Sequence, residues 1–134
     1  MHTLGRPGPA NGKRIVSAMS KLAISTTEQE NTTIFLLEGS ADLTEAGILD
    51  KHLQEVFAQG KYKLVMDLSS LDFTSSLGLS SLIRAHTRCR DNKGQLSLVN
   101  PQPKVLRVFK TTRLTELFEI YPNVEEAVAA MEKG

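Results

Sequence analysis

Tryptophan is absent from this chain of 134 residues, cysteine occurs once, as Cys89, and no apolar run is long. A lone cysteine cannot form an intrachain disulfide, and no Cys/His cluster surrounds it, so disulfide scaffolds and thiolate zinc sites are excluded. The apolar runs, such as residues 34–37, are far shorter than a membrane span, and the N-terminus lacks the apolar stretch of a secretory signal. We therefore expect a cytoplasmic protein that does not insert into membranes.

An excess of charge of either sign is also lacking, because the chain has 16 basic and 15 acidic side chains and a formal charge of +1. Such a balance gives no general electrostatic attraction to nucleic acid, so no direct nucleic-acid binding is expected. A chain of this length buries about two-thirds of its unfolded surface, which is enough for one domain without a stabilising metal or disulfide. Any partner must therefore be recognised by a local surface patch and not by the overall charge of the protein.

Residues 1–18 lack acidic side chains and hold three glycines, two prolines and three basic residues. That composition predicts a flexible basic tail, followed by a single domain over residues 19–134. Two interpretations of the tail are open. In the first, Met19 is the native start and the tail does not belong to the protein; in the second, the tail is a basic docking arm.

Three segments in the first half of the chain predict strands. Residues 22–26 alternate in polarity and residues 33–37 form a β-branched and aromatic run, so the two predict a hairpin that ends at Gly39. Residues 64–68 are apolar without alternation, as in a parallel strand that is covered on both faces. The predicted sheet therefore begins antiparallel and has a buried, parallel centre.

Two helices are predicted around the third strand. The spacing of Asp42 and Glu45 is that of a capping box, and the apolar residues that follow recur at three and four until Gly60 supplies a stop. The second helix has an apolar face with the same spacing, carries Ser81 among its outward residues, and is closed by Gly94. Each helix is therefore expected to pack one face against the sheet.

The remainder of the chain continues this alternation. Residues 95–99 predict a strand, and Asn100 is the predicted N-cap of the helix that follows it. Residues 114–121 are expected to hold a turn and a short strand, and Asn123 is the predicted cap of the last helix. The element order is then ββαβαβαβα, and each strand–helix–strand crossover requires a parallel, right-handed connection. The sequence predicts a single-domain α/β fold: a mixed sheet with an N-terminal hairpin, then parallel strands, and about four helices.

The most informative stretch, residues 67–79, leaves the buried strand and enters the second helix through a cluster of hydroxyl side chains. The free N–H groups and the dipole at a helix N-terminus favour an anion, so a phosphate on Ser75 or Ser76 is tolerated there. The same pattern is explained by a helix cap alone, supplied by Thr74 or Ser75. On the residues alone, capping is the simpler interpretation.

Several segments of the chain resemble the STAS domain of bacterial anti-sigma factor antagonists, over about residues 20–132. They are Gly39-Ser40-Ala41-Asp42, residues 64–68, residues 73–79, and residues 114–118 followed by Glu125-Glu126-Ala127. In that family the second helix begins at Asp-Ser-(Ser/Thr)-Gly-(Leu/Ile), and the anti-sigma factor, a protein kinase, phosphorylates the serine after the Asp. Counting back from Gly78 places this serine at Ser76, with Ser75 as the reserve candidate.

The resemblance implies a partner switch controlled by charge. The unphosphorylated protein is expected to bind the anti-sigma factor serine kinase and free a sigma factor for transcription; a phosphate ends that binding, and a serine phosphatase is a further implied partner. The implied partner-binding residues are Asp42, Thr74, Ser75, Ser76, Leu77 and Gly78. Three positions depart from the family pattern: Ser75 replaces its acidic residue, Leu77 replaces a small hydroxyl residue, and Arg113 replaces a glycine.

Two other classes of function are open. Ser76 sits where a serine hydrolase would place its nucleophile, but the G-x-S-x-G motif is missing and the three histidines are poorly placed as bases, so we expect no enzyme activity. No cofactor fingerprint or metal constellation occurs in the sequence. The second class is a STAS scaffold that is never phosphorylated, such as the regulatory subunit of a lipid or anion transporter or of a signalling complex.

Overall fold

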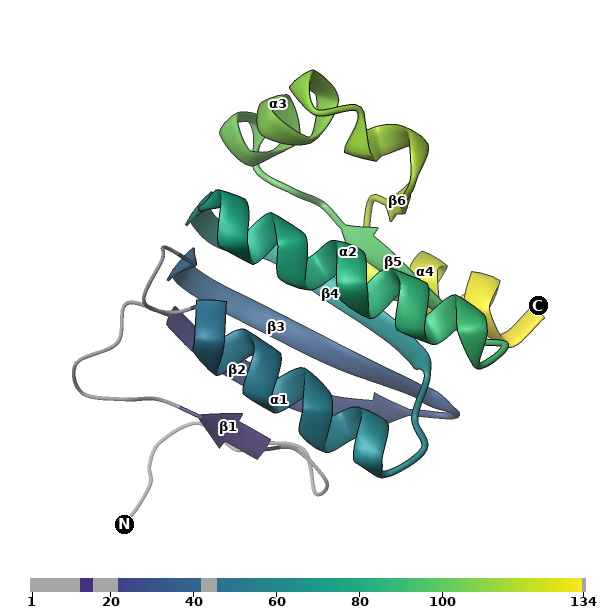
Figure 1. Cartoon of the computed structure of the whole chain (residues 1–134). Helices are drawn as coiled ribbons and strands as arrows, with labels where there is room; N and C mark the ends of the chain where they lie inside the picture. Colours follow the sequence, from purple (N-terminus) through teal and green to yellow (C-terminus); the bar gives the residue numbers. More distant parts are fainter. Residues whose placement is uncertain (1–12, 16–21, 42–45, 134) are drawn as a thin grey trace, which may run out of the picture.

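The structure, a computed structural model, describes residues 13–15, 22–41 and 46–133. Its centre is one sheet of six strands in the spatial order β1-β2-β3-β4-β5-β6 (Figure 1). The strands are β1 (Lys13–Ile15), β2 (Leu22–Gln29), β3 (Thr32–Ala41), β4 (Lys63–Thr74), β5 (Gln95–Val99) and β6 (Glu119–Tyr121). The helices are α1 (Ala46–Ala58), α2 (Ser76–Asp91), α3 (Pro103–Thr111) and α4 (Val124–Lys133), with a short 3-10 helix, η1 (Leu114–Glu116). From β2 onward this is the order ββαβαβαβα, so the predicted fold class is confirmed.

The sheet is mixed, as predicted. Neighbouring strands from β1 to β3 pair antiparallel, and neighbouring strands from β3 to β6 pair in parallel. Each parallel pair is joined through a helical crossover, as such pairs require. Residues 64–66 of β4 are fully buried, because the strand lies inside the sheet and helices cover both of its faces.

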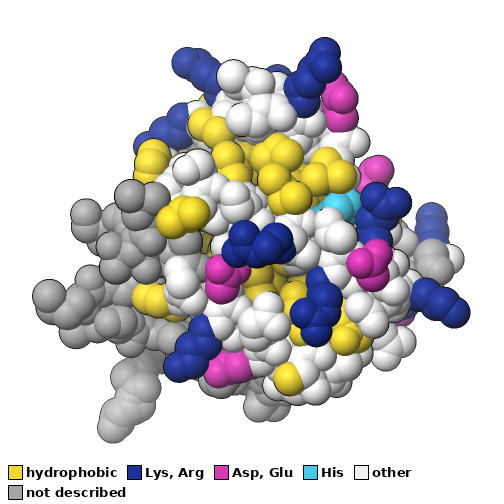
Figure 2. Space-filling model, viewed as in Figure 1, with side chains coloured by type: hydrophobic (Ala, Val, Ile, Leu, Met, Phe, Trp, Pro, Cys, Tyr) yellow, Lys and Arg dark blue, Asp and Glu magenta, His cyan; other side chains and the backbone are white. Residues whose placement is uncertain are grey.

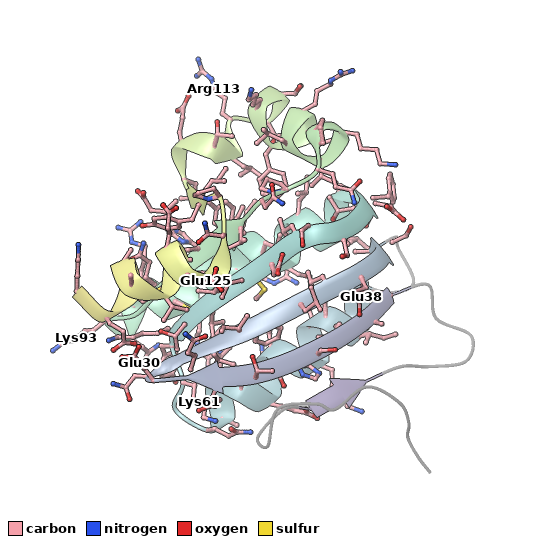
Figure 3. The ribbon with its side chains drawn as sticks, turned by 180° about the vertical axis from the view of Figure 1, so that it is seen from behind. Glu30, Glu38, Lys61, Lys93, Arg113 and Glu125 are labelled. Atoms are coloured by element: carbon pink, nitrogen blue, oxygen red, sulfur yellow. The ribbon has the colours of Figure 1, made fainter. Side chains whose placement is uncertain are left out.

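Two apolar cores lie on the two faces of the sheet. The larger core lies under α1, α2 and α3 and includes Phe35, Leu82 and Phe109. The smaller core lies under α4, where Val128 packs in one cluster with Val65 of β4. Figure 3 shows that α4 covers only part of this second face. The start of α2, which holds the candidate site, belongs to the layer of helices that covers the larger core.

Gly39 does not end the hairpin, contrary to the prediction, because β3 continues to Ala41 and β4 continues to Thr74. Gly39 has a φ of 104°, and the register between the two strands shifts at Gly39 and Ser40, so the chain absorbs an irregularity there instead of leaving the sheet. Beyond it, Ala41 pairs with Thr74. The ends of both long strands are thereby brought to the start of α2.

Three residues of the segment predicted as a tail, Lys13–Ile15, form β1, which pairs antiparallel with residues 24–26 of β2. A strand this short carries no periodic signal, so the sequence did not predict it. The domain boundary at residue 19 stays a prediction.

Two predicted details of the helices are wrong. Asn100 is not an N-cap, because its φ is 46° and its N–H donates to the carbonyl of Tyr121 at 2.9 Å; the N-cap of α3 is Gln102. Ser81 is buried instead of facing outward, and its hydroxyl donates to the carbonyl of Leu77 at 3.1 Å. The Asn100 hydrogen bond reaches a distant residue, whereas the Ser81 hydroxyl bonds to the residue four positions earlier in its own helix.

The predicted boundaries at Gly60 and Asn123 are confirmed, whereas α2 ends at Asp91, before Gly94, and the left-handed residue that follows it is Lys93, with a φ of 65°. Gly60, with a φ of 77°, follows the end of α1, and Asn123 caps α4 by accepting a hydrogen bond from the Glu126 N–H at 2.8 Å. The predicted capping box of Asp42 and Glu45 lies outside the described residues.

Candidate functional site

Ser75 is the N-cap of α2, as one of the two capping interpretations predicted. Its backbone is extended, with a φ of −85° and a ψ of 172°, and its Oγ accepts a hydrogen bond from the Gly78 N–H at 3.2 Å. The Ser75 N–H donates to the carbonyl of Ala41 at 2.8 Å, which ties the cap to the end of β3. Ser75 is 9% exposed. Its hydroxyl is therefore buried and already engaged in holding the helix start.

Thr74 and Gly78 determine how closely α2 approaches the sheet. Thr74 is buried, and its hydroxyl donates to the carbonyl of Ser75 at 3.3 Å. A Cβ on Gly78 would clash with the hydroxyl oxygen of Thr74 and would lie 3.4 Å from the carbonyl oxygen of Ala41. Any side chain at this position would therefore force Thr74 or the start of the helix to shift.

Ser76 is the first residue of α2 and is exposed. Among the three consecutive hydroxyl residues 74–76, it is the accessible one. The helix N-terminus supplies the positive end of the dipole, and no acidic residue occupies the first turn of α2. A phosphate on Ser76 is therefore electrostatically compatible with the helix.

Two large apolar side chains flank the two serines in sequence and are exposed, Phe73 by 52% and Leu77 by 49%. Leu77 is among the predicted partner-binding residues and Phe73 is not, because an apolar residue near the end of a strand is normally expected in the core. The alternation of β4 breaks down here, since Asp72 and Phe73 are both exposed, so no sequence signal predicts the outward direction of Phe73. Two exposed apolar side chains of this size within five residues make this turn a candidate protein-contact surface.

The structure brings five of the six predicted partner-binding residues together. Residues 74–78 form the turn from β4 into α2, at the end of the two long strands (Figure 1). The sixth, Asp42, lies outside the described residues, so its part in partner binding stays a prediction.

The histidine of α2 does not accompany Ser76. His86 lies ten residues farther along the helix, about 15 Å at the rise of an α-helix, and its ring contacts that of Phe118 at a centroid distance of 5.1 Å. Burial lowers the pKa of His86, the charge of Arg90 lowers it further, and a hydrogen bond with the backbone of Leu96 opposes both. The neutral ring therefore belongs to the core and not to a catalytic pair with the serine.

His52 and Cys89 are also core residues. The ring of His52 contacts that of Phe35 at a centroid distance of 5.4 Å. Burial raises the pKa of Cys89 to about 12, against a smaller opposite effect of Arg88, so the thiol is not a nucleophile near neutral pH. Among the residues that the structure describes, no group of three or more side chains is arranged to hold a metal ion. None of the helices formed by the described residues is long and apolar enough to cross a membrane.

Comparison with known proteins points to one regulatory family. The sequence profile of the STAS domain matches residues 23–127. BtrV of Bordetella bronchiseptica, which carries the name of an anti-sigma factor antagonist, is 30% identical over 97 residues, which cover 72% of this chain and 84% of BtrV. The chain therefore belongs to the STAS domain family, and relatives within that family are named anti-sigma factor antagonists.

Two solved structures share the fold. The crystal structure of an anti-sigma factor antagonist from Mycobacterium paratuberculosis is 25% identical and superposes with a TM-score of 0.77 over 87% of this chain and 99% of that chain. The phosphorylated form of the Bacillus cell fate determinant SpoIIAA is 19% identical, with a TM-score of 0.66 over 80% of this chain and 97% of that chain. At that identity, the likeness to SpoIIAA concerns the fold alone.

Proposed function

We propose that this protein is an anti-sigma factor antagonist that binds an anti-sigma factor serine kinase through the start of α2 and releases it once Ser76 is phosphorylated. One observation carries the proposal. Ser76 is exposed between two exposed apolar side chains, Phe73 and Leu77, whereas the hydroxyls of Thr74 and Ser75 are buried and hydrogen-bonded. The names of the relatives support the same function. The switch operates in the cytoplasm, and a serine phosphatase restores the bare form.

In the bare form, Phe73 and Leu77 supply the apolar area of the interface. Complete burial of a Phe or Leu side chain contributes roughly 1.5–3 kcal/mol, and each of these two is about half exposed before binding, so about half of that contribution is available from each. A partner that covers the start of α2 covers both side chains and the exposed Ser76 hydroxyl, which lies between them in sequence. The bare hydroxyl is small and neutral, so its burial costs little when it finds a hydrogen-bond partner.

Phosphorylation reverses this balance without a new fold. The phosphate adds about −1.5 to −2 charge at pH 7, and the N–H groups and dipole at the start of α2 tolerate it there. The same group must lose its water when a partner closes over Phe73 and Leu77, and an unpaired charge is costly to desolvate. Affinity for the partner therefore falls, while the helix and the sheet remain as they are.

Ser75 stands where the family has an acidic residue, and it performs the capping task that an aspartate performs. Its hydroxyl accepts the Gly78 N–H, as a carboxylate oxygen does at other N-caps. The exchange therefore keeps the helix start and removes one negative charge next to Ser76. Recognition by the kinase then relies on the remaining surface, including the exposed Phe73 and Leu77.

The modification is tested by phosphopeptide mapping with mass spectrometry, on protein recovered from its own cells in growth, in stationary phase and under stress. Phosphate on Ser76 is expected in at least one condition. Ser76→Ala should abolish the signal, whereas Ser75→Ala should retain it. Phosphate on Ser75 instead would contradict the assignment of Ser76. No phosphate in any condition would contradict the switch and favour a constitutive STAS scaffold.

The effect of charge on binding needs a separate measurement, the affinity of each variant for the purified anti-sigma factor. Ser76→Ala should bind as the bare protein does, and Ser76→Asp should bind about tenfold more weakly or worse because it places a charge in the interface. Thr87→Asp adds the same charge at an exposed position farther along α2 and should leave the affinity unchanged. Equal affinities for wild type and both Ser76 variants would contradict the proposed switch.

A further inference from the structure

The chain between Asp91 and Glu116 carries five basic residues and no acidic one, although the whole protein is nearly neutral. Three of the five, Lys104, Arg107 and Lys110, lie on α3 and are exposed. Within the described residues, none of these three forms an ion pair. α3 is therefore a basic element on a protein that has almost no net charge.

The electrostatics of the helix itself do not explain this distribution. Lys110 lies in the last turn of α3, where the helix dipole favours a cation. Lys104 lies in the first turn, where the dipole disfavours a cation, and no acidic residue compensates for it there. Lys104 therefore does not stabilise the isolated helix. Its position is better explained by an interaction with a partner outside the chain.

Val108 is exposed among these charges. α3 buries Val105 and Phe109 in the core. Helical spacing makes Lys104, Arg107 and Val108 neighbours on the exposed surface of α3, with Arg107 directed away from the two buried residues and Val108 at the border of the buried face. The other large apolar side chains exposed in the described part of the chain are Phe73, at the end of β4, and Leu77, at the start of α2. The exposed residues Lys104, Arg107, Val108 and Lys110 are here called the basic α3 surface.

The basic α3 surface adjoins the candidate site. Nε2 of Gln102, the N-cap of α3, donates to the carbonyl of Ser69 at 3.1 Å and to Oδ1 of Asp72 at 3.4 Å, and Asp72 directly precedes Phe73. Figure 1 shows α3 beside α2, on the side away from α1. In Figure 2, apolar side chains gather between these two helices, and Lys and Arg side chains lie over α3. A partner large enough to cover the start of α2 therefore has α3 within its reach.

We propose that the basic α3 surface docks an acidic patch on the same protein partner that covers Ser76. The inference rests on the proposed function and adds the chemistry of the partner. An apolar centre with a charged rim is the arrangement found at protein–protein interfaces. Rim charges that face opposite charges on a partner act mainly by raising the association rate. A lipid surface fits less well, because the main apolar face of α3 is buried in the core and is not free to enter a membrane.

The test uses the full chain and the purified anti-sigma factor kinase of the same cell, and it measures association rate constants at low and high salt. Lys104→Glu/Arg107→Glu should lower the rate constant about tenfold at about 25 mM NaCl and much less at about 300 mM, because salt screens exposed charges. Lys104→Gln/Arg107→Gln removes the charges without reversing them and should act in the same direction with a smaller effect. Circular dichroism checks that both variants keep the fold.

The matched control is Lys93→Glu/Lys133→Glu, which changes the net charge equally at exposed residues outside α3. Figure 3 shows Lys93 well apart from Arg113, which follows the end of α3. This control should keep the rate constant within about twofold of the wild type. Equal slowing by the control and by the α3 reversal would overturn the inference.

Ser76→Asp, measured in the same series, separates the inference from the proposed function. If the α3 reversal has no specific effect and Ser76→Asp still weakens binding, the inference is overturned and the switch stands. If the reversal slows association and Ser76→Asp has no effect, the docking surface is supported and the switch is overturned. No binding by the wild type overturns both. Binding to phosphatidylserine vesicles or to a DNA duplex that the reversal abolishes would assign the surface to lipid or nucleic acid and overturn the inference.

Discussion

The hydroxyl oxygen of Thr74 occupies the space into which a side chain on Gly78 would project. Thr74 ends β4 and Gly78 lies in the first turn of α2, so this contact sets the distance between the helix and the strand that precedes it. The two serines of the candidate site lie between them in sequence. The different environments of their hydroxyls therefore depend on a close approach that a larger residue at position 78 would prevent.

Gly78→Ala should lower the free energy of unfolding by about 1–3 kcal/mol, because the added methyl group forces the Thr74 side chain or the helix to shift. Gly47→Ala in α1 is the matched control, since no atom lies within 4 Å of its Cβ position, and it should leave stability unchanged or raise it by up to about 1 kcal/mol. Urea unfolding measures both. Thr74→Ala/Gly78→Ala should recover part of the loss; a purely additive result would show that the Thr74 hydroxyl is not the obstacle.

Most of the fold is predictable from the sequence because most of its strands and helices carry their own apolar period. The hairpin, the buried strand β4 and the helices under the larger core are of this kind. Two of the errors have another cause, which is a contact with a distant segment. Asn100 donates to Tyr121, twenty-one positions away, and β3 continues past Gly39 because it stays paired with β4. A local pattern contains no information about such partners.

The candidate site is less predictable than the fold. Three consecutive hydroxyl residues are visible in the sequence, but the choice between Ser75 and Ser76 depends on which hydroxyl is engaged in capping, and only the packed turn determines that. Phe73 follows the buried Leu71 by two residues, so strand alternation predicts it in the core. It is exposed because the regular alternation of β4 ends before it. The position of Ser76 itself follows from a resemblance and not from residue chemistry.

Arg113 adopts a left-handed conformation, with a φ of 65°, between α3 and η1. That conformation costs an L-residue about 1–2 kcal/mol, and the exposed pair that Arg113 forms with Glu116 at 3.8 Å stabilises little. Arg113→Gly should raise the free energy of unfolding by about 0.5–1 kcal/mol, after allowing for the greater freedom of glycine in the unfolded chain. Arg107→Gly, inside α3, should lower it by about 1 kcal/mol. A loss of stability in Arg113→Gly during urea unfolding would rule out relief of strain.

His86 makes the stability of the fold depend on pH. Burial and Arg90 lower its pKa from the ordinary value of 6.5, so the folded protein binds fewer protons at this residue than the unfolded chain does. The contribution to the free energy of unfolding is complete above about pH 7 and is lost as the pH falls through 6.5 toward the lower pKa of the folded state. Nδ1 of His86 is buried and has no hydrogen-bond partner among the described residues, which agrees with a neutral ring.

Urea unfolding between about pH 5 and about pH 8 measures this dependence. His86→Phe keeps an aromatic ring against Phe118 and should make the loss of stability at acid pH smaller. Thr87→Val changes the next residue, which is exposed, and should keep the wild-type profile. Identical pH profiles for wild type and His86→Phe would assign the acid sensitivity to other groups.

Ser75 allows capping to be separated from switching. Ser75→Ala should lower the free energy of unfolding by about 1 kcal/mol, because the Gly78 N–H loses its acceptor. Ser75→Asp introduces the acidic residue of the family pattern and should restore that loss, since a carboxylate accepts the same N–H and is favoured by the helix dipole. Urea unfolding compares the two. An aspartate variant as unstable as the alanine variant would show that the cap hydrogen bond is not what Ser75 contributes.

The same two variants test which serine accepts the phosphate. Neither change removes the exposed hydroxyl of Ser76, so incubation with the anti-sigma factor kinase and ATP should phosphorylate Ser76 in both, as intact-protein mass spectrometry will detect. Ser76→Ala, whose cap is intact, should gain no phosphate. If instead Ser75→Ala stayed folded and gained no phosphate, while Ser76→Ala did, the buried capping hydroxyl would be the acceptor. The start of α2 would then have to open before the kinase could act, because Ser75 is 9% exposed in the folded helix cap.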